Sequence, residues 1–144
     1  MHTAFPDRPL VILKVGDTHA ALAEALGDFE HWVARGLGDG ALTVAVLDPR
    51  RGDTLPPPQT LAGVVLTGSH AMVSHRAPWS EATGRWLADA ARGGLPLLGI
   101  CYGHQLLADA LGGRADDHPQ GLELGTVTVD LLPAAADDPL FGGL

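Results

Sequence analysis

Short apolar runs alternate along this chain with longer segments in which apolar residues recur every three or four positions. The short runs are typical of strands buried on both faces, and the longer segments are typical of helices with one buried side. Strands and helices that alternate in this way indicate a parallel sheet with helices on both faces. We therefore expect an α/β fold built on an open parallel sheet.

The pattern places the buried strands at residues 9–15, 41–47, 61–66 and 96–100. The last of these runs into Cys101, and we expect it in the centre of the sheet. The helical spacing covers residues 20–37, 79–90 and 103–111. Pairs of glycines end the second and third helices. A final strand is expected at residues 126–131, because Val127, Val129 and Leu131 alternate with polar residues.

Composition narrows the range of partners. The chain has 144 residues, a formal net charge of −8 and a single lysine, Lys14, so it offers no basic stripe for nucleic acid or an anionic membrane. No segment is apolar and long enough to cross a bilayer, and residues 1–8 do not resemble a secretion signal. One cysteine excludes an internal disulfide and two-cysteine metal motifs. We expect one cytoplasmic domain, residues 1–144, with no metal and no cofactor.

The single cysteine lies in the sequence Gly99-Ile100-Cys101-Tyr102-Gly103, where an apolar strand passes directly into a helix. This is the context of a nucleophile elbow, a sharp turn that presents a nucleophile at the end of a sheet. Glycines two residues to either side suit such a turn, because side chains there would collide. A thiol at a helix N-terminus also faces unpaired N–H groups, which stabilise a thiolate. Cys101 is therefore a candidate nucleophile; the alternative is a buried cysteine between ordinary glycines.

The residues around this turn resemble those of a known family. Residues 99–107, followed by Gly112 and Gly113, are similar to the nucleophile segment of class I glutamine amidotransferases. The resemblance implies the flavodoxin-like fold of that family, with Cys101 as the nucleophile. It also implies that Gln105, four residues later, contacts the substrate. A surface glutamine on a helix is the alternative for Gln105.

A second segment resembles the part of the same family that stabilises the transition state. Residues 64–69 are similar to the strand and glycine turn that supply one backbone N–H of the family's oxyanion hole. The resemblance implies that this N–H belongs to Gly68 or Ser69 and that Tyr102 supplies the second. Two donors suit the chemistry, because attack on an amide places negative charge on its oxygen. Residues 118–127 resemble the branch similar to GMP synthase amidotransferase domains.

The general base of the family is not found in this chain. A cysteine amidohydrolase needs a base beside the thiol and a group that orients that base. The family uses a His-x-Glu pair well downstream of its cysteine, but no His-x-Glu follows Cys101, and His118 lies too close to it. The other nearby histidines are interpreted as surface residues: His70, His75 and His104. We therefore expect that residues 1–144 are a truncated amidotransferase domain.

The resemblance implies an enzyme that releases ammonia from glutamine through a cysteinyl thioester and delivers it to a synthetase subunit or domain. Two alternatives stay open. A stand-alone γ-glutamyl hydrolase or peptidase uses the same chemistry on another γ-glutamyl compound, and a domain without a base would be a catalytically inactive binding module. A cysteine hydrolase of the α/β-hydrolase type also uses Gly-x-Cys-x-Gly, but it gives no reason for Gln105.

Overall fold

The structure is a computed structural model that describes residues 8–40 and 42–143. Its centre is a four-stranded sheet in the order β2-β1-β3-β4, and all neighbouring strands are parallel. The strands are β1 (Leu10–Leu13), β2 (Val44–Leu47), β3 (Gly63–Leu66) and β4 (Leu97–Gly99). Residues 1–7, Ala41 at the expected start of the second strand, and Leu144 lie outside the described residues. The expected parallel sheet is confirmed.

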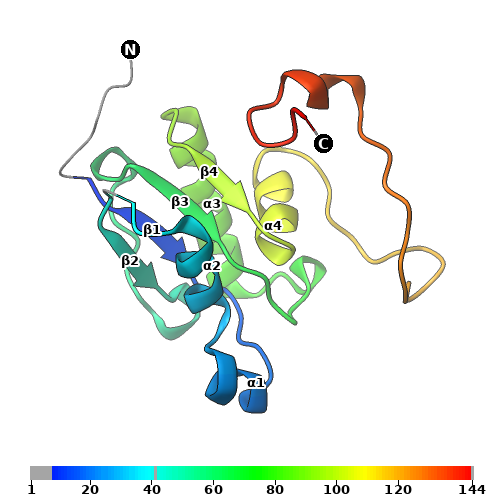
Figure 1. Cartoon of the computed structure of the whole chain (residues 1–144), viewed down its shortest axis with the longest axis horizontal. Helices are drawn as coiled ribbons and strands as arrows, with labels where there is room; N and C mark the ends of the chain where they lie inside the picture. The colour runs from blue at the N-terminus through cyan, green and yellow to red at the C-terminus, as the bar shows by residue number, and fades with distance from the viewer. Residues whose placement is uncertain (1–7, 41, 144) are drawn as a thin grey trace.

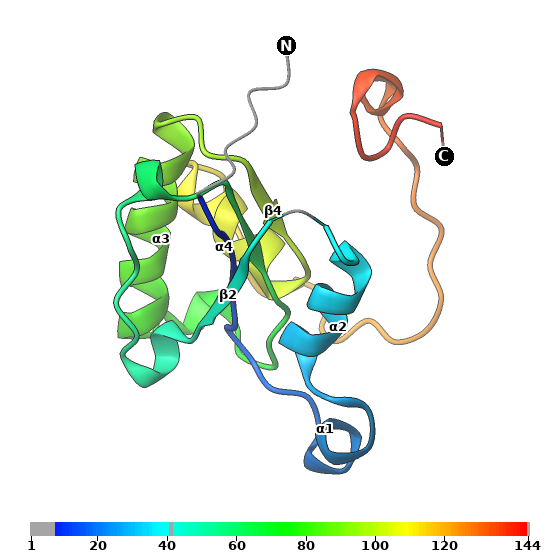
Figure 2. The same cartoon turned by 60° about the vertical axis from the view of Figure 1, so that its left-hand side comes forward.

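Helices cover both faces of the sheet, so the body has three layers (Figure 1). Figure 2 shows α3 (Pro78–Arg92) and α4 (Tyr102–Ala110) on one face and α2 (Phe29–Leu37) on the other. The short helix α1 (Ala20–Leu26) lies next to α2, outside the layers. The expected helices on both faces are confirmed.

The face that carries α3 and α4 holds the main core. Because the parallel strands are in register, Val11 lies beside Val64, and Leu13 lies beside Leu66. These buried side chains pack against Leu87 of α3 and against two residues of α4, Tyr102 and Leu106. A fully buried leucine contributes about 1.5–3 kcal/mol of apolar transfer free energy, so this face holds much of the stability of the fold.

The opposite face of the sheet is only partly covered. Under α2, Ile12 and Val65 are buried on the two central strands. The register places Val46 of β2 and Leu98 of β4 on the same face, and these residues keep 46% and 39% of their surface exposed. The strand next to the elbow is therefore open on the side of α2.

The helix expected at residues 20–37 is wrong in one respect, because it is two helices. Gly27 has a φ of 81°, a left-handed value that ends α1, and Asp28 begins α2 as its N-cap. The Oδ1 atom of Asp28 accepts hydrogen bonds from the N–H groups of Thr18 and Phe29, each at 2.7 Å. Apolar periodicity concealed the break, because the same spacing resumes after it.

The strand expected at residues 126–131 is also wrong. Residues 113–132 contain no helix or strand, and beyond Asp117 this segment runs outside the layered body in both views (Figures 1 and 2). Val129 in this segment keeps 76% of its surface exposed. A strand needs a hydrogen-bonded neighbour, and alternation does not supply one. Within the described residues β4 has only β3 beside it, so β4 lies at an edge and not in the expected centre.

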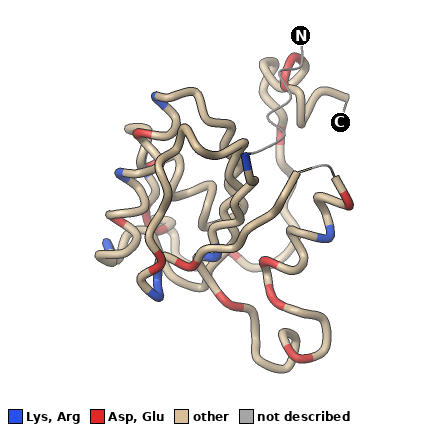
Figure 3. Tube along the Cα trace, turned by 90° about the vertical axis from the view of Figure 1, so that its left-hand side faces the viewer, with Lys and Arg blue, Asp and Glu red and all other residues tan. Residues whose placement is uncertain are grey.

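Charged residues are distributed along the part of the chain that the structure describes. Figure 3 shows acidic positions along the body and the C-terminal segment, with fewer basic positions between them. This distribution accords with the formal net charge of −8. None of the described helices is long and apolar enough to cross a bilayer.

Truncation of Leu87 is expected to destabilise the fold strongly. Leu87 is fully buried, and Leu87→Ala should lower the free energy of unfolding by about 2–5 kcal/mol because it leaves a cavity. The matched control is Leu26→Ala on exposed α1, with an expected change within about 0.5 kcal/mol. Urea unfolding followed by circular dichroism measures both. Equal losses in the two variants would contradict the assignment of the core.

Candidate active site

Cys101 lies in the turn between β4 and α4, as expected for an elbow. It is the N-cap of α4, with φ 54° and ψ −111°, and its side chain is exposed. A positive φ at a residue other than glycine costs on the order of 1–3 kcal/mol and persists only where the surroundings impose it. The close backbone contacts of Gly99 and Gly103, two residues to either side, impose this conformation on Cys101.

Both glycines are required by close approaches of the backbone. A Cβ on Gly99 would lie 2.5 Å from the backbone nitrogen of His104 and 2.6 Å from the carbonyl oxygen of Gly103. A Cβ on Gly103 would lie 2.5 Å from the Cβ of Leu66 and 2.8 Å from its carbonyl oxygen. A side chain at either position would therefore collide with the backbone or with Leu66. The sequence did not indicate that Leu66 of β3 is the residue that leaves no room for a side chain at position 103.

The turn that follows β3 lies directly beside Cys101. A Cβ on Gly68 would be 3.5 Å from the Cβ of Cys101 and 3.9 Å from its Sγ, which is ordinary contact distance. The N–H of Gly103 donates to the carbonyl of Thr67 at 3.2 Å, and the Oγ1 of Thr67 accepts from the N–H of Val15 at 3.0 Å. The glycine turn and the elbow therefore meet at the same end of the sheet, as expected.

Among the described residues, no acceptor is found for the N–H groups of Gly68, Ser69 and Tyr102. Tyr102 is the first residue of α4, where helix geometry leaves the N–H without a partner. Gly68 and Ser69 line the same cavity as Cys101. The assignment of these groups to an oxyanion hole stays a prediction.

The side chain of Tyr102 anchors the start of α4 in the core. It is buried, its hydroxyl lies 2.7 Å from the Oγ of Ser80, and its ring centroid lies 5.7 Å from that of Trp79. Burial raises the pKa of Tyr102, so the hydroxyl stays protonated at neutral pH. The sequence analysis assigned a role only to the N–H of Tyr102. The contacts of its side chain depend on how α3 packs against α4, which the sequence does not specify.

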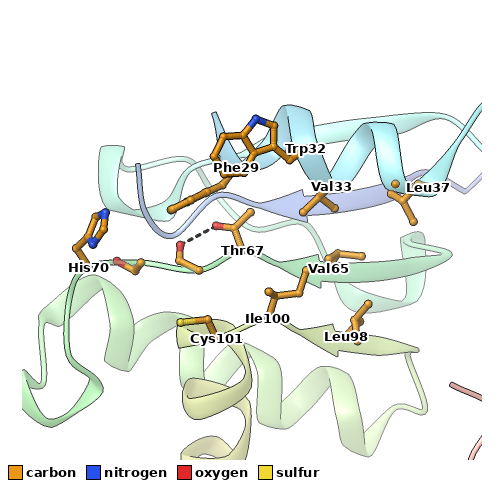
Figure 4. Close-up of a pocket in the computed structure, with 13 residues that line it drawn as sticks. Phe29, Trp32, Val33, Leu37, Val65, Thr67, His70, Leu98, Ile100 and Cys101 are labelled. Atoms are coloured by element: carbon orange, nitrogen blue, oxygen red, sulfur yellow. Dashed lines mark hydrogen bonds between the residues drawn. The ribbon is translucent and has the colours of Figure 1, made fainter. Parts of the chain in front are cut away.

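A cavity of about 680 Å³ extends from Cys101 along the partly covered face of the sheet. Figure 4 shows it between α2 and the ends of β3 and β4, with Cys101 and His70 at one end. Most of its lining is apolar: Phe29, Trp32, Val33, Leu37, Val65, Leu98 and Ile100. The volume and lining suit a small-molecule site.

Gln105 lies on the surface of α4. It is exposed on α4, and its side chain does not belong to the described cavity lining. Its N–H donates to the carbonyl of Cys101 at 3.0 Å, so it lies one helical turn from the elbow. Its contact with substrate stays a prediction.

None of the described histidines pairs with the thiol. His70 lines the cavity, but its ring centroid lies 5.2 Å from that of His19 and 6.4 Å from that of Phe29. Three others are exposed: His75, His104 and His118. No described histidine hydrogen-bonds to the sulfur of Cys101, and the described residues contain no group of three or more ligands placed to hold a metal ion.

Comparison with known proteins gives consistent matches. Residues 22–138 match the family described as glutamine amidotransferase class-I. The chain is 34% identical over 131 residues to a subunit of the glutamine-hydrolyzing GMP synthase of Halobacterium salinarum, a match that covers 88% of this chain and 62% of that protein. The counterpart from Haloarcula marismortui is 37% identical over 121 residues, or 82% of this chain and 54% of that protein.

Solved structures agree with the sequence matches. The crystal structure of a glutamine amido transferase from Methylobacillus flagellatus aligns with a TM-score of 0.59 and 25% identity, over 78% of this chain and 42% of that one. The chain thus spans less than two thirds of the length of these relatives. The likeness to this structure extends to the fold.

Gly103→Ala is expected to disrupt the elbow. The added methyl group would collide with Leu66, so we expect a loss of at least about 1–3 kcal/mol in unfolding free energy, as for other overpacked sites. The matched control is Gly36→Ala in α2, where an added Cβ meets nothing within 4 Å. That change should be neutral or stabilise by up to about 1 kcal/mol through helix propensity. Urea midpoints of the two variants in opposite order would refute the steric role of Gly103.

Proposed function

The chain belongs to the class-I glutamine amidotransferase family, and from that premise we propose that it hydrolyses the side-chain amide of glutamine with Cys101 as the nucleophile. The contact between Cys101 and the Gly68 turn carries the proposal. It brings a strained, exposed thiol and unpaired N–H groups to one cavity. A nucleophile and donors for a developing oxyanion are the two parts that acyl transfer requires first.

In the proposed reaction the sulfur of Cys101 attacks the amide carbon and forms a tetrahedral intermediate. Its negative oxygen would accept hydrogen bonds from the N–H of Tyr102 and from that of Gly68 or Ser69. One such donor is typically worth about 10²–10³ in rate. The C–N bond then breaks, ammonia leaves with an added proton, and a γ-glutamyl thioester remains. Water hydrolyses the thioester to glutamate and returns the thiol.

The proton steps require a base that we assign to a His-x-Glu segment outside these 144 residues. Two observations support this assignment. No described histidine hydrogen-bonds to the sulfur, and the relatives are longer than the matched chain. General acid–base catalysis is typically worth about 10²–10⁴ in rate, so its loss would leave the elbow reactive but slow in turnover. These residues would then be one part of a longer amidotransferase domain.

Two relatives are named as subunits of GMP synthase, so we propose that ammonia passes to a synthetase partner that activates the acceptor. The apolar lining beside Cys101 favours a second candidate, the hydrolysis of a γ-glutamyl amide with an apolar amine part. Both functions use the same thioester. They differ in whether glutamine or the substituted amide is the better substrate.

Cys101→Ala is expected to abolish hydrolysis in a version of the chain that includes a downstream His-x-Glu. Removal of the sulfur removes the atom that forms the thioester, so ammonia release should fall at least about 10³-fold. Coupled-enzyme detection of ammonia measures glutamine turnover, and release of aniline from γ-glutamyl anilide tests the second candidate. Full activity in the alanine variant would eliminate Cys101 as the nucleophile.

The 144-residue chain itself is expected to show little turnover of glutamine, while a chloroketone analogue of glutamine alkylates Cys101. The elbow suffices for attack on a reagent with a good leaving group, whereas ammonia needs a proton donor. Mass spectrometry locates the adduct, and ammonia release measures turnover. The alanine variants of His70, His75, His104 and His118 serve as controls. Robust turnover that only one of them loses would identify that histidine as the base.

A further inference from the structure

Lys14, the only lysine of the sequence, lies among three carboxylates at the end of β1. Its side chain is only 12% exposed, and its Nζ lies 2.7 Å from Asp28, 2.8 Å from Glu30 and 3.2 Å from Asp17. We call these four residues the Lys14 cluster. The ammonium group of Lys14 thus connects the loop after β1, which contains Asp17, to the start of α2, which contains Asp28 and Glu30.

Both signs of charge persist in this cluster at neutral pH. Burial lowers the pKa of Lys14, but hydrogen bonds to Asp28, Glu30 and Asp17 outweigh this effect and raise the pKa to about 12. Burial raises the pKa of Asp28, but the hydrogen bonds from Lys14 and from the N–H groups of Thr18 and Phe29 lower it overall. Removal of the ammonium alone would leave the carboxylates of Asp28 and Glu30 close together without it, which is costly.

The first segment held by the cluster is the start of α2. The Oδ2 atom of Asp28 accepts from Lys14 while its Oδ1 atom caps α2, and Glu30 lies in the first turn of the helix. No residue from Phe29 to Leu37 is fully buried, so apolar packing alone holds this helix loosely. The helix supplies one wall of the cavity beside Cys101 (Figure 4).

The second segment is the loop that follows β1 and contacts the glycine turn. The N–H of Val15, next to Lys14, donates to Thr67 at 3.0 Å. Gly16 fits so closely against the turn that a Cβ on it would lie 2.5 Å from the carbonyl oxygen of Gly68. Asp17 is fixed by Lys14 and by both terminal nitrogens of Arg50, at 2.6 and 3.1 Å.

We propose that Lys14 is a positioning residue that sets the distance between the α2 wall and the Gly68 turn, and thereby the fit of a γ-glutamyl group at Cys101. This inference rests on the proposed function, because it concerns the same site. Lys14 is not part of the cavity lining and touches no reacting atom. It acts through Asp28 on the helix and through residues 15–17 on the turn.

The test compares two alkylating reagents on the 144-residue chain. A chloroketone analogue of glutamine must fit the site, whereas iodoacetamide needs only an accessible thiol. Lys14→Met is expected to slow the chloroketone about 10–100-fold, the loss typical of a misplaced reacting group, and to change the iodoacetamide rate less than about 3-fold. Lys14→Arg keeps the charge and should recover most of the loss. The matched control, Arg92→Met, removes an exposed ion pair with Asp89 and should alter neither rate.

Hydrogen exchange provides a readout that does not depend on the substrate. In Lys14→Met the amides of the first turn of α2 and of Val15, which donates to Thr67, should exchange faster, while those of α3 keep their protection. If Lys14→Met does not fold, Asp28→Asn replaces it, because the amide keeps the cap but loses the charge. Unchanged exchange in the folded variant, or an unchanged preference for the chloroketone, would overturn the proposal. Failure of the proposed function would show differently, as a wild-type chain without any preference for the glutamine analogue.

Discussion

The close approach of α4 to β3 is the contact on which the candidate site depends. Gly103 lies so near Leu66 that no side chain fits between them, and its N–H donates to the carbonyl of Thr67. This contact holds the elbow in a conformation with positive φ at Cys101. The same contact brings the turn at Gly68 to the thiol. The contact between α4 and β3 thus accounts both for the strained backbone at Cys101 and for the nearby backbone N–H groups.

The two faces of the sheet differ in what they can support. The face under α3 and α4 is closed, and its buried side chains supply a rigid base for the elbow. The face under α2 is partly open, so side chains such as Val65 and Leu98 line a cavity instead of a filled core. A rigid scaffold on one side and free volume on the other is an arrangement that positions a reactive group and still admits a ligand.

Charge compensates for weak packing at the open face. α2 buries no residue completely, and its start is held by Asp28 and Glu30 on the ammonium of Lys14. Buried ion pairs contribute little net stability where desolvation offsets the attraction, and we infer that here they fix the position of the helix. The ion pairs therefore define where the helix begins more than they strengthen the fold.

The sequence by itself determined the local features: the parallel α/β pattern, the elbow at Cys101 and the glycine turn at Gly68. The first two follow from periodicity and from the sterics of a sharp turn, whereas the turn at Gly68 was indicated by its resemblance to the family. Tertiary structure alone decided the edge position of β4 and the burial of Lys14 among carboxylates. It also left residues 126–131 unpaired, because a strand needs a neighbour that alternation cannot specify. These features depend on contacts between segments that are distant in the sequence, and the pattern of residues along one chain does not specify those contacts.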